Sequence, residues 1–128
     1  MKLDVCGVVE TWFGGGEGKG KMEEVLREEN FVWIGKDREG RKGGGIGFLV
    51  RKGVYVSVPK VNKAEGLMWI EIALQGEKIF IAVIYLAPKV KEVNERLLEE
   101  LSEDINFFCE QGRIFLVGDF NWLENGDR

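Results

Sequence analysis

The hydrophobic period of the chain changes at Pro88, and this change constrains the fold more than any other feature. Before Pro88, short apolar segments alternate with glycine-rich and charged loops, which predicts strands. Over residues 91–110 the apolar positions recur every three or four residues, which predicts one amphipathic helix. A final apolar segment, residues 114–117, follows the helix. The pattern favours an α/β or α+β fold, with a mixed, largely antiparallel sheet and helices on one face.

The individual elements follow from the same reading. Strand 54–58 should lie at or near a sheet edge because Pro59 follows it, and residues 75–77 should form a hairpin turn. The long helix should present one apolar face, made of Val93, Leu97, Leu98, Leu101, Ile105 and Phe108. The remaining predicted elements are strands 3–9, 31–34, 46–50, 67–74, 78–86 and 114–117 and a helix over 21–29.

Length and composition limit the possible chemistry. A chain of 128 residues is long enough for one packed domain and too short for two, so residues 1–128 should form a single domain. Its two cysteines fit neither a disulfide framework nor a metal-ligand spacing. Because the chain has no histidine, histidine zinc sites and Ser-His triads are excluded within it.

Hydropathy and charge indicate where such a chain would act. No apolar run approaches the roughly 20 residues that span a membrane, and no targeting segment is recognisable, so we expect an intracellular protein, cytoplasmic or nuclear. The net charge of -4 argues against general affinity for nucleic acid. Residues 19–52 nevertheless carry nine Lys and Arg against six Asp and Glu, which would allow weak phosphate attraction.

The segment that ends the last predicted strand carries two polar side chains. Residues 114–117 form an apolar run that predicts a strand buried on both faces, and Gly118 should end it. Asp119 and Asn121 follow directly, where α/β proteins usually place their chemistry. The alternative is an Asx turn in which Asp119 bonds its own backbone.

The end of the first predicted strand allows two interpretations. Glu10 is a second carboxylate at a strand end. A few residues later, the segment 15–21 has the glycine and lysine spacing of a phosphate-binding P-loop, which would make Lys21 a nucleotide ligand. Met22 stands where that motif needs a magnesium-binding hydroxyl, so a nucleotide binder is the weaker interpretation.

Four motifs in order resemble the endonuclease/exonuclease/phosphatase superfamily, and most closely the endonuclease domain of non-LTR retrotransposon reverse transcriptases. They are Glu10-Thr11-Trp12, the segment from Gly43 to Arg51, the segment from Ile84 to Pro88, and Gly118-Asp119-Phe120-Asn121. The resemblance implies a Mg²⁺-dependent phosphodiesterase that acts on DNA, with Mn²⁺ as a possible substitute, and an αββα sandwich fold.

The resemblance also implies a role for each matching residue. Glu10 corresponds to the glutamate that ligates the metal ion, and Tyr85 to the tyrosine that contacts the scissile phosphate. Asp119 corresponds to the aspartate that orients or deprotonates the attacking water, and Asn121 to an asparagine that binds a phosphate oxygen. These types suit the reaction, which needs a hard cation, a positioned water and hydrogen-bond donors.

The chain lacks other parts of the family pattern. An asparagine on an earlier strand and a later Asp-His pair have no counterpart here. We therefore expect a truncated sandwich that binds metal weakly and has activity close to background. We also expect an exposed sheet face or edge that favours a homodimer, with a symmetric face-to-face contact in place of the missing half. A non-catalytic, self-associating module with the same fold is the alternative from a different functional class.

Overall fold

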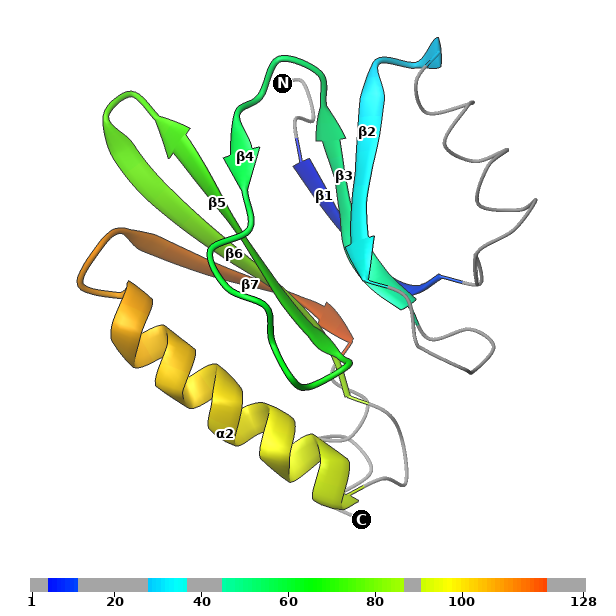
Figure 1. Ribbon diagram of the computed structural model, residues 1–128, viewed down its shortest axis with the longest axis vertical. Helices are drawn as coiled ribbons and strands as arrows, with labels where there is room; N and C mark the ends of the chain where they lie inside the picture. The colour runs from blue at the N-terminus through cyan, green and yellow to red at the C-terminus, as the bar shows by residue number, and fades with distance from the viewer. Residues whose placement is uncertain (1–4, 12–27, 37–44, 87–90, 120–128) are drawn as a thin grey trace.

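The computed structural model describes residues 5–11, 28–36, 45–86 and 91–119 (Figure 1). This part of the chain is mixed α+β, as predicted, and consists mostly of strands with one long helix. The predicted helix over 21–29 falls almost entirely outside the described residues. The described elements are β1 (Val5–Thr11), β2 (Phe31–Lys36), β3 (Gly45–Arg51), β4 (Val56–Ser57), β5 (Leu67–Leu74), β6 (Glu77–Tyr85), α2 (Lys91–Phe108) and β7 (Arg113–Asp119).

The strands divide between two sheets that face each other, where the sequence predicted one. The first sheet has the order β1-β3-β2 and is antiparallel; the second has the order β4-β5-β6-β7, with β6 and β7 parallel. The helix α2 lies against the side of the second sheet that faces away from the first, so three layers result (Figure 1). The hairpin between β5 and β6 turns at Gln75 and Gly76, both with positive φ, close to the predicted position.

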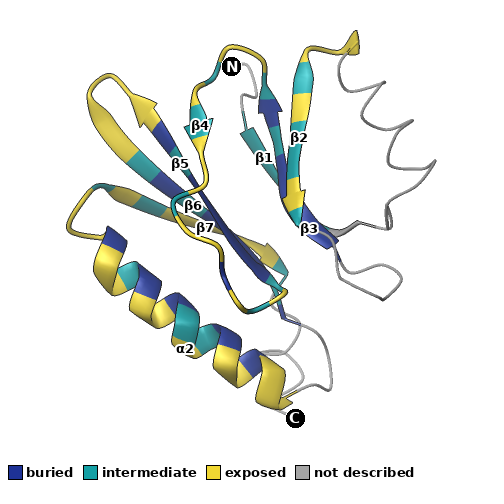
Figure 2. Ribbon diagram, in the orientation of Figure 1, coloured by how far each residue is buried: buried dark blue, intermediate teal, exposed yellow. Residues whose placement is uncertain are grey.

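The alternation of side chains along the second sheet supplies two separate cores. On β5, Leu67 and Trp69 face α2, whereas Met68 and Ile70 face the first sheet. Because both faces of this sheet are covered, its central strands are buried at successive positions over part of their length (Figure 2). The expected exposed face is therefore absent from the middle of the second sheet in the described part of the chain.

The buried face of α2 differs from the predicted one at its first turn. Val93 was assigned to the apolar face but is 51% exposed, and the neighbouring Asn94 is buried. Leu97, Leu101 and Phe108 pack on the sheet as predicted. The predicted apolar row is therefore correct from Leu97 onward. In the first turn of α2 the buried side chain is Asn94 and not Val93.

The strand β7 is an edge strand, so the prediction that residues 114–117 are buried on both faces is wrong. Phe115, Leu116 and Val117 are 50%, 41% and 37% exposed, and in the described part of the chain β6 is the only strand that pairs with β7. Figure 2 shows this strand largely in the colour of exposed residues. An apolar run alone does not distinguish a central strand from an edge strand, because the distinction depends on partners distant in the sequence.

Candidate functional site

Tyr85 and Asp119 are brought together by the register of two parallel strands. The ladder pairs Ile79 with Arg113 at one end and Tyr85 with Asp119 at the other. The backbone N–H of Leu86 donates to the carbonyl oxygen of Asp119 over 3.0 Å, which extends the pairing beyond β6. Since both residues stand at the carboxyl ends of their strands and are half-buried, a phenol and a carboxylate share one rim of the sheet.

Gly118 allows the ladder to continue as far as Asp119. The prediction that Gly118 ends the strand is wrong, because β7 runs through it. Its φ of +146° is one that residues with a side chain rarely adopt, and a Cβ at this position would overlap the carbonyl oxygen of Ile84. The glycine therefore permits the close approach of β7 to β6 that sets Asp119 beside Tyr85.

The strand that carries Glu10 ends on the same side of the molecule. Gly7, three residues before Glu10, packs against Val117, two residues before Asp119: a Cβ at Gly7 would lie 2.6 Å from Val117 Cγ2. The carboxyl ends of β1, β6 and β7 lie at one end of the sandwich (Figure 1). The backbone of Glu10 lies near the end of β1, as predicted, and its side chain lies outside the described part of the structure.

The other predicted site residues lie outside the described ranges. Asn121 follows the last described residue, and the P-loop-like segment 15–21 with Lys21 precedes residue 28, where description resumes. Within residues 5–11, 28–36, 45–86 and 91–119, no group of three or more Asp, Glu, Cys or His side chains has the geometry of a metal site. Of the four site residues, Tyr85 and Asp119 are the two that the described strands place opposite each other.

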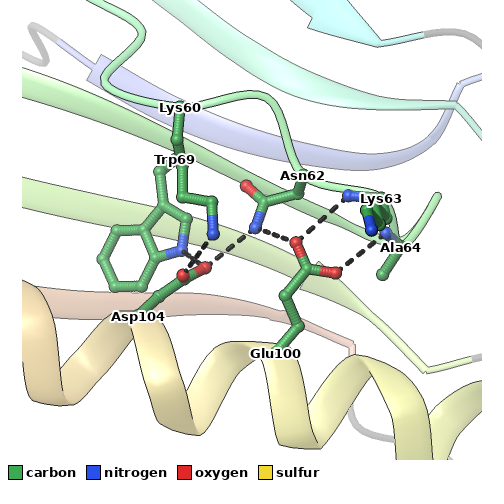
Figure 3. Close-up of polar contacts among 7 residues, drawn as sticks. All are labelled: Lys60, Asn62, Lys63, Ala64, Trp69, Glu100 and Asp104. Atoms are coloured by element: carbon green, nitrogen blue, oxygen red, sulfur yellow. Dashed lines mark hydrogen bonds and ion pairs between the residues drawn. The ribbon is translucent and has the colours of Figure 1, made fainter.

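A second group of polar residues, which the sequence did not reveal, joins α2 to the loop between β4 and β5 (Figure 3). Asp104, buried on α2, accepts hydrogen bonds from Lys60 Nζ at 2.7 Å, Asn62 Nδ2 at 2.8 Å and Trp69 Nε1 at 2.9 Å. One turn earlier, Glu100 accepts from Asn62 Nδ2 at 2.5 Å and from the backbone N–H groups of residues 63 and 64, each at 3.1 Å.

The position of Asp104 in the helix was a signal that could have been used. It follows Leu101 by three residues and precedes Phe108 by four, so it lies in the buried row of α2. Glu100, four residues before Asp104, accepts its hydrogen bonds from the same loop. Every oxygen of the two carboxylates accepts a bond from this chain, so we interpret the group as a structural clamp.

Two lysines complete the attachment of this loop, and their surroundings shift their pKa values in opposite directions. The hydrogen bond to Asp104 raises the pKa of Lys60 above its usual 10.5. Lys36 Nζ, on β2, donates to the carbonyl oxygens of Asn62 at 2.7 Å and Ala64 at 2.6 Å, and burial lowers the pKa of Lys36. A cavity of about 360 Å³ beside Lys36 is lined mainly by apolar side chains, and Tyr85 and Asp119 are not among its lining residues.

Comparison of the chain with models of known protein families found no match, and a search of curated proteins found no similar sequence. None of the helices in the described part of the chain combines the length and apolar character needed to cross a membrane.

Proposed function

We propose that this chain is a Mg²⁺-dependent phosphodiesterase-like domain of the endonuclease/exonuclease/phosphatase type, with DNA as its substrate class. The observation that carries the proposal is the parallel register that sets Tyr85 beside Asp119. These residues belong to two motifs far apart in the sequence, and the resemblance requires both at one phosphate. The carboxyl end of β1, which carries Glu10, points to the same end of the sandwich.

The arrangement of layers also supports this fold. Two facing sheets with α2 on the outside are consistent with three of the four layers of an αββα sandwich. The fourth layer would come from the predicted helix over 21–29, which follows β1 and precedes β2. We interpret the chain as a partial version of that sandwich.

Each side chain of this site has a distinct task in the proposed reaction. The Asp119 carboxylate would orient a water molecule and accept its proton as the water oxygen attacks phosphorus. The bond from phosphorus to the sugar oxygen of the leaving strand would break, and that oxygen would take a proton from solvent. The Tyr85 hydroxyl and the Asn121 amide would donate hydrogen bonds to phosphate oxygens, where negative charge builds as the oxygen–phosphorus bond forms. Glu10 and Asp119 offer carboxylate oxygens, which fit a hard cation such as Mg²⁺ or Mn²⁺. Bound there, the ion would supply charge neutralisation at the phosphate.

Turnover by the chain itself should be low. The sequence has no histidine, so the imidazole of the family's Asp-His pair is missing from it. Removing one catalytic donor commonly lowers kcat by about 10²- to 10³-fold, and cooperating groups lose activity non-additively. We therefore expect weak metal binding and cleavage slightly above background.

A nicking assay on supercoiled plasmid tests the proposal. The protein is incubated with Mg²⁺ or Mn²⁺, and EDTA serves as the metal-free control. Nicking should fall to background in Asp119→Asn and drop strongly in Tyr85→Phe. The matched control is Glu77→Gln, which removes an exposed carboxylate at the opposite end of β6 and should leave nicking unchanged. Equal nicking by the wild type and Asp119→Asn would show that the activity does not come from this site.

The alternative is a non-catalytic, self-associating module that keeps the fold. The exposed apolar edge of β7 favours it. Broadening of the protein's NMR signals by added Mn²⁺ distinguishes the phosphodiesterase from the non-catalytic module. Selective broadening of signals near Asp119, together with Asp119-dependent nicking, supports the phosphodiesterase. Absence of both supports the module.

A further inference from the structure

The strand β7 presents an open edge in the described part of the chain. It stands last in the order β4-β5-β6-β7 (Figure 1). Three successive apolar residues on it, Phe115, Leu116 and Val117, are each more than a third exposed. An edge strand that is long, regular and apolar is a template for pairing with another strand.

The backbone groups that such a strand would use can be identified from the ladder. The Asp119 carbonyl accepts from Leu86 N–H, so the backbone of Asp119 is directed at β6. Because backbone groups alternate in direction along a strand and the register with β6 is constant, those of Leu116 are directed at the open edge. The same holds for Ile114 and Gly118. The edge therefore offers regularly spaced donors and acceptors over most of β7.

We propose that a second copy of this chain binds along this edge, with its β7 antiparallel to the first and the two-fold axis at Leu116. The contact would join the two four-stranded sheets into one sheet of eight. It goes beyond the proposed function, because it assigns an interaction surface along β7; Asp119 is the one residue that belongs both to this surface and to the proposed site.

The sequence of β7 is complementary to itself in this register. With the two-fold axis at Leu116, each residue lies opposite the one that is equally far from Leu116 on the other side. Arg113 therefore faces the partner's Asp119, and Phe115 faces the partner's Val117. Opposite charges thus meet at both ends of an apolar centre. If the partner strand were shifted by two residues, Phe115 would lie opposite the partner's Asp119. Arg113 would then have no acidic residue opposite it, and both charge pairs would be lost. Arg113 lies 3.6 Å from Glu77 of its own chain, but both side chains are well exposed, so this ion pair is easily exchanged.

This self-complementarity is what favours a second copy over an unrelated strand. A strand with a cation at one end, an anion at the other and apolar residues between them is complementary to an identical strand that runs antiparallel to it. The two-fold axis also places side chains from the same face of each sheet next to each other. Leu116 meets the partner's Leu116 on the side of α2, and Phe115 meets the partner's Val117 on the side of the first sheet.

Sedimentation equilibrium on the full chain gives the first test. The wild type should be a concentration-dependent dimer, and Leu116→Lys should raise its dissociation constant about tenfold or more, because two lysines would meet at the axis. The control Val93→Lys changes a similarly exposed apolar residue on α2 and should leave the dimer intact. Circular dichroism confirms that each variant folds. A monomeric wild type, or a dimer unaffected by Leu116→Lys, would overturn the proposal.

Disulfide trapping tests the register. In a background of Cys6→Ala and Cys109→Ser, the single variants Phe115→Cys and Val117→Cys are purified separately, allowed to exchange subunits, and oxidised. The mixture should form a crosslinked dimer, because residue 115 faces the partner's residue 117. Neither variant alone should do so. Crosslinking of one variant alone to the same extent as the mixture would contradict the register, whatever the nicking assay shows.

Discussion

The indole Nε1 of Trp69 donates a hydrogen bond to Oδ2 of Asp104 over 2.9 Å, at a point where both side chains are buried. The bond links β5 to α2 through a carboxylate inside the apolar layer between them. The Phe108 ring packs against Trp69 at an interplanar angle of 58°, with the two ring centroids 5.0 Å apart. A buried carboxylate is tolerated here because Lys60 and Asn62 also donate to it.

Asp104→Ala should therefore destabilise the fold strongly. Removing the carboxylate leaves the buried Trp69 N–H and the Asn62 amide without this acceptor, and each buried donor left unsatisfied costs about 1–3 kcal/mol. The lost ion pair adds little, because the Lys60 side chain is 39% exposed and water can solvate it. The control Glu103→Ala removes a neighbouring exposed carboxylate and should change the free energy of unfolding by about 0.5 kcal/mol or less. Urea denaturation measures both. Equal stability of the two variants would mean that the clamp contributes little.

The ion pair between Lys60 and Asp104 should also make stability depend on alkaline pH. The hydrogen bond to Asp104 raises the pKa of Lys60 in the folded protein above 10.5. The folded state then binds more protons than the unfolded state above pH 10.5, so the stabilisation is complete below that pH and declines as the pH rises through the folded-state pKa. The difference in unfolding free energy between the wild type and Lys60→Met should be constant from pH 7 to 9 and shrink above 10.5. A difference that grows above 10.5 would reverse the assigned shift.

Local patterns in the sequence predicted most elements correctly because their causes are local. The apolar segment and the turn after it predicted a strand over residues 67–74, and β5 has these bounds. The helical period likewise identified α2. The pairing of Tyr85 with Asp119 could not be read from any period, because register between strands 34 residues apart depends on the whole sheet. The family resemblance supplied that expectation instead.

The errors have a common physical origin. The burial of residues 114–117 and of Val93 was judged from hydrophobicity, which does not report how far a neighbouring layer extends. The clamp was missed for the converse reason. Asp104 and Asn62 are polar, and polarity suggests exposure unless partners from elsewhere in the chain satisfy the groups.

Two substitutions by alanine on α2, Leu97→Ala and Val93→Ala, test which face of the helix is buried. Leu97 is 1% exposed in the core between α2 and the sheet, so Leu97→Ala should cost about 2–5 kcal/mol of unfolding free energy. Val93→Ala, at an exposed position in the first turn, should cost well under 1 kcal/mol. Chemical denaturation of both variants gives the comparison. Similar losses would mean that the first turn is packed as tightly as the rest.

The approach of β7 to β6 at Gly118 can be tested by adding one methyl group. Gly118→Ala should lose about 3 kcal/mol or more, because its Cβ would overlap the carbonyl oxygen of Ile84 and its φ is positive. The matched control is Gly76→Ala at the hairpin turn, which also has positive φ but no atom within 4 Å of the new Cβ. This control should cost only about 1 kcal/mol, the price of backbone strain alone. NMR shifts of the Tyr85 ring provide a second measurement, since they should change in Gly118→Ala and stay constant in Gly76→Ala. Equal stability losses would mean that strain, not the contact with Ile84, makes glycine necessary beside Asp119.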